Sequence, residues 1–165
     1  KSLFILTSAL LFTANVLAEN DPLWMRYPAI SPNGETIAFT YKGDIYTVPA
    51  NGGKATQLTT HPAHDTRPIW SPDGSKIAFA SDRNGNFDIF IMDMEGGSPK
   101  QLNHSPSANE YPETGYSDAK HILYSAAIQQ DAKDSQFPSG QFPQIYRIGI
   151  NGGAPNSILP SPWKA

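Results

Sequence analysis

Oxygen-bearing side chains alternate along Asp82–Asp88, a spacing that resembles the start of a calcium-binding loop. An EF-hand loop, however, needs glycine at its sixth position and a bidentate glutamate at its twelfth. Here Gly85 stands fourth and Asp93 twelfth. Because Phe87–Met92 also has the pattern of a β-strand, turn chemistry explains the run better than a calcium site.

The segment His61–Asp65 brings two imidazoles and a carboxylate together and could offer them to a metal. An intervening proline in a connecting loop gives these side chains no preset geometry, and the chain has no cysteine to complete a structural zinc site. His104 and His121 are isolated. We therefore predict no metal site.

Nucleophilic catalysis finds no support either. The Gly-x-Ser-x-Gly turn of hydrolases is absent from the sequence. Ser117–Lys120 and Ser161–Lys164 match Ser-x-x-Lys, but that chemistry needs a helical turn, whereas the first falls in a predicted β-turn and the second contains Pro162. We predict no catalytic and no cofactor-binding residues in this chain.

A repeat organises the chain. Arg67–Phe79 rewrites Tyr27–Phe39 forty residues later, and a third, degenerate copy follows with the same internal spacings of four, seven and six residues. The anchors are Asn33, Ile37, Ile45, Gly52 and Leu58, then Asp73, Ile77, Ile89, Gly96 and Leu102, then Asp118, Ile122, Ile145, Gly152 and Ile158. A period near forty indicates an array of small supersecondary units.

Each copy divides into four short runs of apolar and β-branched residues between turns. In the second copy these runs are Arg67–Trp70, Lys76–Ser81, Phe87–Met92 and Pro99–Leu102. Ser–Pro–Asp–Gly separates the first two, and Tyr116–Ala119 stands at that place in the third copy. Four antiparallel strands per forty residues are typical of a β-propeller blade.

We therefore predict an all-β fold, a β-propeller with three four-stranded antiparallel blades at about residues 26–60, 66–103 and 110–159 of a partial propeller, 26–165. Three blades cannot close a ring, whose usual minimum is ~4. We expect the chain to be the amino-terminal part of a longer protein, with exposed edges where further blades pack.

Loop lengths vary on one face only. Between the second and third strands the anchor isoleucines lie eight, twelve and twenty-three residues apart. Insertions on one side usually mark the binding side of a repeat protein, although surface loops also lengthen without function. The predicted binding face, which carries these hairpins and the connections between blades, comprises His61, His64, Asp65, Asp82, Arg83, Asn84, Gln136 and Phe137.

Charge and the amino terminus bear on location. The net charge is −3 with no basic run, which argues against nucleic acid and anionic membranes as partners.

Residues 1–18 resemble a secretory signal: a basic start, an apolar run and small residues before Glu19. The run is shorter than the ~20 residues of a spanning helix. We expect an exported protein, periplasmic or extracellular, with a lead-in at 19–25 and no membrane contact after cleavage.

Pro68–Phe79 reads Pro–x–Trp–Ser–Pro–Asp–Gly–x–Lys–Ile–Ala–Phe, and Ser81–Phe90 follows it. This pattern resembles the repeat of TolB-type propellers, found in TolB, in tricorn-like proteases and in the prolyl-oligopeptidase group. The resemblance covers about residues 23–159. Two features favour the tricorn-like group: a propeller that starts at Leu23–Pro28, directly after the signal, and a long third-blade insertion, Ala127–Pro143.

The resemblance implies a function. In tricorn-like serine peptidases the propeller gates or guides peptides toward a distant carboxy-terminal domain that holds the catalytic serine and histidine, so no residue here takes those roles. The implied partners are a peptide or protein ligand, further blades and downstream domains; no cofactor is implied. The alternatives are a TolB-like periplasmic interaction scaffold without enzymatic activity and a prolyl-oligopeptidase-type hydrolase.

Overall fold

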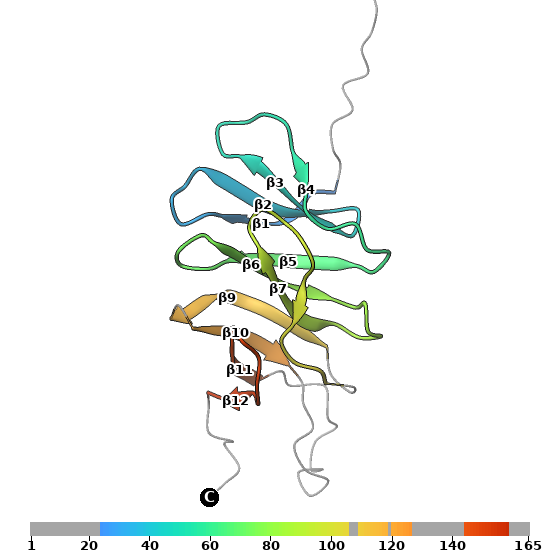
Figure 1. Ribbon diagram of the computed structural model, residues 1–165, viewed down its shortest axis with the longest axis vertical. Helices are drawn as coiled ribbons and strands as arrows, with labels where there is room; N and C mark the ends of the chain where they lie inside the picture. The colour runs from blue at the N-terminus through green and yellow to red at the C-terminus, as the bar shows by residue number, and fades with distance from the viewer. Residues whose placement is uncertain (1–23, 106–108, 119, 127–143, 159–165) are drawn as a thin grey trace, which may run out of the picture.

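The computed structural model describes residues 24–105, 109–118, 120–126 and 144–158, which form strands and turns (Figure 1). No helix in these ranges is long and apolar enough to cross a membrane. The first sheet contains β1 (Arg26–Ile30), β2 (Thr36–Tyr41), β3 (Asp44–Pro49) and β4 (Thr56–Gln57); the second β5 (Asp65–Trp70), β6 (Lys76–Ser81), β7 (Asp88–Asp93) and β8 (Lys100–Gln101); the third β9 (Glu110–Asp118), β10 (His121–Ala126), β11 (Gln144–Gly149) and β12 (Asn156–Ser157).

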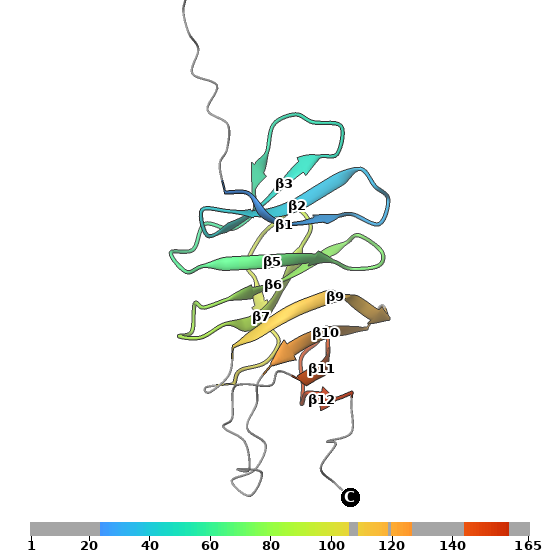
Figure 2. The ribbon, with the colours of Figure 1, turned by 180° about the vertical axis from the view of Figure 1, so that it is seen from behind.

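Each sheet is an antiparallel meander whose strands pair in chain order. The predicted all-β fold of three four-stranded antiparallel sheets, an incomplete propeller ring, is thus confirmed. The three sheets stack along the long axis of the molecule (Figure 1). Figure 2 shows β1, β5 and β9 one below another, so the first strand of each blade lies beside that of the next.

The turn after each first strand is held by side chains. Ser71 Oγ donates to Asp73 Oδ1 at 2.6 Å and accepts from the backbone N–H of Lys76 at 2.8 Å, and Asp73 Oδ1 also accepts from the N–H of Ser75. The hydrogen bonds from Ser71 and Ser75 lower the pKa of Asp73 to about 2. Ser31 and Asn33 repeat this arrangement in the first blade.

The third turn differs from the predicted one at Tyr116–Ala119, because β9 continues through Asp118 and pairs with His121. The prolines that interrupt backbone pairing at positions 32 and 72 are replaced by Ser117 in this copy. One contact survives: Asp118 Oδ1 accepts from the N–H of Lys120 at 2.8 Å. The third copy therefore has the aspartate contact of the other two turns but not their proline.

Two apolar clusters hold the sheets together, one on each side of the second sheet. Trp70, Phe79 and Phe90 pack against Ile45 of the first blade, and Ile89 packs with Tyr124 of the third. Trp70 Nε1 also donates to the carbonyl oxygen of Ala29 at 2.9 Å. Burial of each large side chain stabilises the fold by about 1.5–3 kcal/mol. The middle blade is consequently buried on both faces.

Hairpins and blade connections meet on one face, as predicted. The backbone N–H of Asp65, which begins β5, donates to Gly43 of the β2–β3 hairpin at 2.7 Å. The N–H of Glu110, which begins β9, donates to the carbonyl oxygen of Phe87 in the β6–β7 hairpin, also at 2.7 Å. Each first strand is therefore tied to the hairpin of the preceding blade.

Candidate functional site

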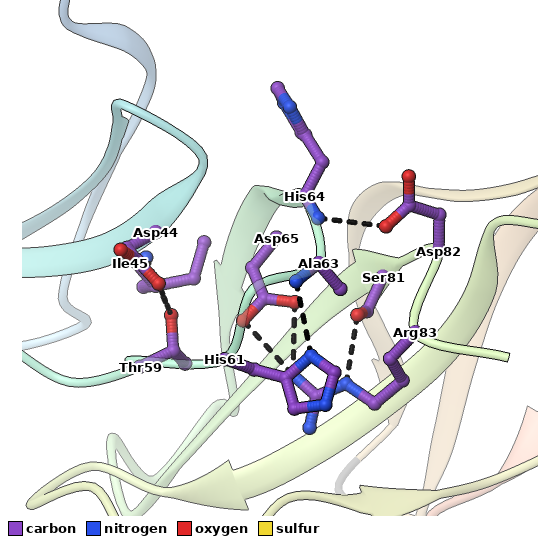
Figure 3. Close-up of polar contacts among 10 residues, drawn as sticks. All are labelled: Asp44, Ile45, Thr59, His61, Ala63, His64, Asp65, Ser81, Asp82 and Arg83. Carbon is purple, nitrogen blue, oxygen red and sulfur yellow. Dashed lines mark hydrogen bonds and ion pairs between the residues drawn. The ribbon is translucent and has the colours of Figure 1, made fainter.

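Two members of the predicted binding face form a buried ion pair. Both carboxylate oxygens of Asp65, which is fully buried, accept from Arg83 Nη2 at 2.9 Å (Figure 3). Arg83 Nε donates to Ser81 Oγ, and its guanidinium lies 4.6 Å from the ring centroid of Phe90. These side chains anchor the hairpin to the blade connection, so the Asp65 carboxylate is not presented to an external ligand.

Of the other described members, His61, His64 and Asn84 are exposed and Asp82 is half-buried. The backbone N–H of His64 donates to Asp82 Oδ1 at 2.7 Å, while its ring points away from the ion pair (Figure 3). His61 Nδ1 accepts from the N–H of Ala63, and Asn84 Nδ2 donates to Gln101 Oε1. The remaining two predicted residues, Gln136 and Phe137, lie outside the described residues.

The carboxylates that begin the third strands were missed by the sequence reasoning. Asp88 is fully buried and accepts from Gln101 Nε2 at 2.8 Å, and Asp44 accepts from Gln57 Nε2 at 2.9 Å. The signal was available, since both repeats place Asp before the anchor isoleucine and Gln before the anchor leucine. Across the described ranges, no three His, Asp or Glu residues are grouped to hold a metal ion.

Glu110 occupies the position in β9 that Asp65 has in β5, and it is also fully buried. Neither carboxylate oxygen has a hydrogen-bond partner among the described residues. Burial raises the pKa of Glu110 to about 7; the nearby Asn103 amide opposes this shift and Asp88 adds to it. Burial also raises the pKa of Tyr124, with a further contribution from the charge of Glu110. The carboxyl group of Glu110 is therefore poised to hold a proton near neutral pH.

A groove of about 490 Å³ opens on the face that carries the hairpins, where the first strands of the three blades begin. Its size falls within the ordinary range of ligand sites. The residues around it come from β1, β5 and β9, from the segments just before β1 and β5, and from β2 and the two hairpins: Trp24, Arg26, Tyr27, Thr40, Lys42, Gly43, His64, Thr66, Arg67, Phe87 and Tyr111. The groove therefore combines aromatic rings with cationic side chains.

The rings and one guanidinium of this groove form a continuous series of contacts. The Arg67 guanidinium lies 4.5 Å from the ring centroid of Tyr111 and 5.2 Å from that of Tyr27. The Tyr111 ring lies 5.3 Å from that of Phe87, which contacts the His64 ring edge-on at 6.0 Å. Since these residues come from three blades, the groove depends on how the blades stack.

Strained backbone orients the two central side chains. Tyr27 and Arg67 have φ values of 53° and 54°, which non-glycine residues rarely adopt. Both precede a proline and lie where the pairing register of the first strand shifts. Bulges of this kind re-aim side chains, and strained residues gather at functional sites. The strain therefore supports the groove as the candidate site.

Sequence reasoning did not identify the groove residues, except His64. A signal existed, because each copy places a large side chain before the proline of its first strand, namely Tyr27, Arg67 and Tyr111. Turns and apolar anchors reveal a repeat, but they do not reveal which side chains line a groove between blades.

The stacked meanders are blades of an incomplete β-propeller, and the groove lies where their first strands begin. Residues 22–164 match the family described as the tricorn protease N-terminal beta propeller domain, and the chain belongs to this family.

Individual relatives share parts of the chain. Tricorn protease homolog 1 of Streptomyces coelicolor is 36% identical over 83 residues, which cover 50% of this chain and 8% of that protein. Protein TolB homolog of Chlorobium luteolum is 37% identical over 83 residues, covering 48% and 18%. The structure of a putative TolB from Agrobacterium tumefaciens superposes with a TM-score of 0.69 at 20% identity, covering 83% of this chain and 50% of that one. The chain thus spans a minor part of these two curated relatives.

Proposed function

We propose that this chain is the amino-terminal propeller of an exported tricorn-like serine peptidase, in which it gates peptides or binds protein partners. It would contribute recognition, while the chemistry would reside in another domain of the intact protein. Membership of the tricorn propeller family supports this proposal.

The groove is the observation that carries the proposal. It lies on the face where loop length varies, it is built by residues of all three blades, and strained backbone directs Tyr27 and Arg67 toward it. Aromatic walls bind extended chains through apolar contact, and cationic groups orient them. A propeller that handles peptides needs such a surface.

A TolB-like periplasmic scaffold without enzymatic activity is the second candidate. The similarity to a TolB homolog supports it, because the identity equals that to the tricorn homolog within one percentage point, 37% against 36%. Whether the intact protein carries a peptidase domain after Ala165 distinguishes the two functions.

The test replaces Tyr27 by asparagine in the full-length protein. Asparagine tolerates positive φ, so Tyr27→Asn removes the ring without adding backbone strain. We expect kcat/KM for a long peptide to fall about three- to tenfold, since aromatic contacts contribute ~0.5–1.5 kcal/mol. Hydrolysis of a single-residue chromogenic amide should not change.

Lys54→Gln, on the opposite face, is the matched control and should leave both rates unaltered. Unchanged peptide hydrolysis in Tyr27→Asn would exclude the groove as the peptide site. A full-length protein that hydrolyses neither substrate would contradict the peptidase and favour the scaffold.

A further inference from the structure

We propose that the groove selects an extended peptide segment rich in Asp and Glu side chains, with the Arg67 guanidinium as the group that receives a carboxylate. This inference rests on the proposed function and deepens it by naming the chemical class of the ligand.

The charge of the groove differs from that of the whole chain. Arg26, Lys42 and Arg67 line it, and none of its lining residues is acidic. The chain as a whole carries 15 acidic against 12 basic residues. A concave surface of one sign concentrates ligands of the opposite sign. The groove is therefore complementary to an anionic segment.

Arg67 is held ready for a carboxylate. Its guanidinium lies over the rings of both Tyr27 and Tyr111, while its side chain remains 35% exposed. Arg67 has one acidic neighbour, Glu113, whose Oε1 lies 4.0 Å from Nη1 in a long ion pair that is beyond hydrogen-bond distance. The same oxygen accepts a hydrogen bond from Ser125 Oγ. No described residue accepts a hydrogen bond from the Arg67 guanidinium. Its planar fork can donate two parallel hydrogen bonds to a carboxylate.

A peptide fits this surface better than a nucleic acid. Aromatic rings beside cations also occur in single-strand binding sites. Nucleic acids, however, bind chiefly through many phosphate contacts, and this groove offers three cations on a chain of net charge −3. Alternating acidic residues of an extended peptide could instead meet Arg67 and its two cationic neighbours while the intervening residues contact the rings.

The experiment measures binding of fluorescent peptides to the full-length protein. A poly-(Gly-Glu) peptide is compared with poly-(Gly-Gln), both amidated at the carboxyl terminus so that no terminal carboxylate contributes. We expect poly-(Gly-Glu) to bind about tenfold or more tightly, because hydrogen bonds to charged groups contribute ~1.5–3 kcal/mol. The difference should shrink at high salt.

Three variants locate the effect. Arg67→Gln keeps an unbranched side chain at the same strained φ, and it should remove most of the preference for the acidic peptide. Arg67→Lys should retain part of it, since the charge remains and the planar fork is lost. Lys54→Gln removes one exposed cation from the opposite face and should change nothing.

The outcomes separate the two proposals. Equal binding of both peptides, or an unaltered preference in Arg67→Gln, would overturn the inference while leaving a peptide-binding groove. Binding of neither peptide would overturn the groove itself and with it the proposed function. Tighter binding of oligothymidylate than of poly-(Gly-Glu) would make the groove a single-strand site and refute the peptide.

Discussion

Asp65 and Glu110 begin the first strands of the second and third blades, yet only Asp65 has a cationic partner among the described residues. Asp65 is neutralised by Arg83, whereas Glu110 has no cationic partner among the described residues. A carboxylate buried without a partner favours its protonated form, which is why the pKa of Glu110 rises to about 7. At the residue scale, the same position therefore holds an ion-paired carboxylate in the second blade and a carboxyl group without a described cationic partner in the third.

Glu110 should make the fold less stable as pH rises. Its pKa is about 7 in the folded state against 4.5 in the unfolded state. Below pH 4.5 the group is protonated in both states and does not affect stability; between pH 4.5 and 7 the free energy of unfolding falls as the unfolded state releases its proton first. Above pH 7, Glu110→Gln should be more stable than the natural chain by about 3 kcal/mol, with no gain below pH 4.5. Urea unfolding across this range checks the prediction. Glu95→Gln, at an exposed position, is the control and should leave the pH profile unchanged. Parallel pH profiles of the natural chain and Glu110→Gln would refute the prediction.

At the scale of the elements, the hairpin after the third strand of the second and third blades packs on the preceding blade. Glycine is required at position 152 for two reasons. Its φ is 87°, and a β-carbon would lie 3.0 Å from the carbonyl oxygen of Leu102. At Gly96, where φ is 92°, a β-carbon would lie 3.5 Å from the carbonyl oxygen of Leu58, an ordinary contact distance. Gly52 has a similar φ of 90° and no atom within 4 Å. The turn thus serves as a contact between blades.

Gly52 and Gly152 allow conformational strain to be separated from the contact between blades. Gly52→Ala should destabilise the fold by ~1–2 kcal/mol, the cost of a left-handed alanine. Gly152→Ala carries the same cost and additionally pushes the third blade from the second, so its loss should be larger. Thermal unfolding of both variants measures the difference. Equal losses would mean that the hairpin can yield without disturbing the interface.

Most element positions were predictable because turn chemistry and apolar anchors are local. The structure shifts the strand limits of the second repeat by at most two residues, as in Arg67–Trp70, which begins at Asp65. The register shifts at Tyr27 and Arg67 were not predictable, since a residue before proline favours extended backbone and these two have positive φ. In this conformation Tyr27 and Arg67 contact each other across two blades, and Arg67 also contacts the Tyr111 ring of the third.

At the scale of the whole molecule, equivalent residues differ in burial because their blades have different neighbours. Trp70 is 7% exposed, packed between the second blade and the first, while Ile30 at the same repeat position is 56% exposed. Both apolar clusters include residues of the second blade. The middle sheet is therefore the most protected part of the described structure.

Amide hydrogen exchange in the 165-residue chain should reflect this order. Exchange should be slowest in β6 and β7, whose two faces are covered, and fastest in β1 and β12, whose residues are mostly exposed. Mass spectrometry of peptides from each sheet checks the ranking. Equal protection of all three sheets would show that they open together and that burial does not control local stability.

The sequence alone determined the repeat, the four strands of each blade and the face on which loops vary, because turns and alternating apolar residues act over a few neighbouring positions. Only the tertiary structure decided what those residues do. It placed Asp65 and Arg83 in a buried pair rather than on an open surface, and it brought Tyr27, Arg67 and Tyr111 into one stack. Asp65 and Arg83 lie 18 positions apart within the second blade, and their pairing needs the hairpin to fold back onto the start of β5. Tyr27, Arg67 and Tyr111 come from three different blades, so their contacts exist only once the blades have stacked.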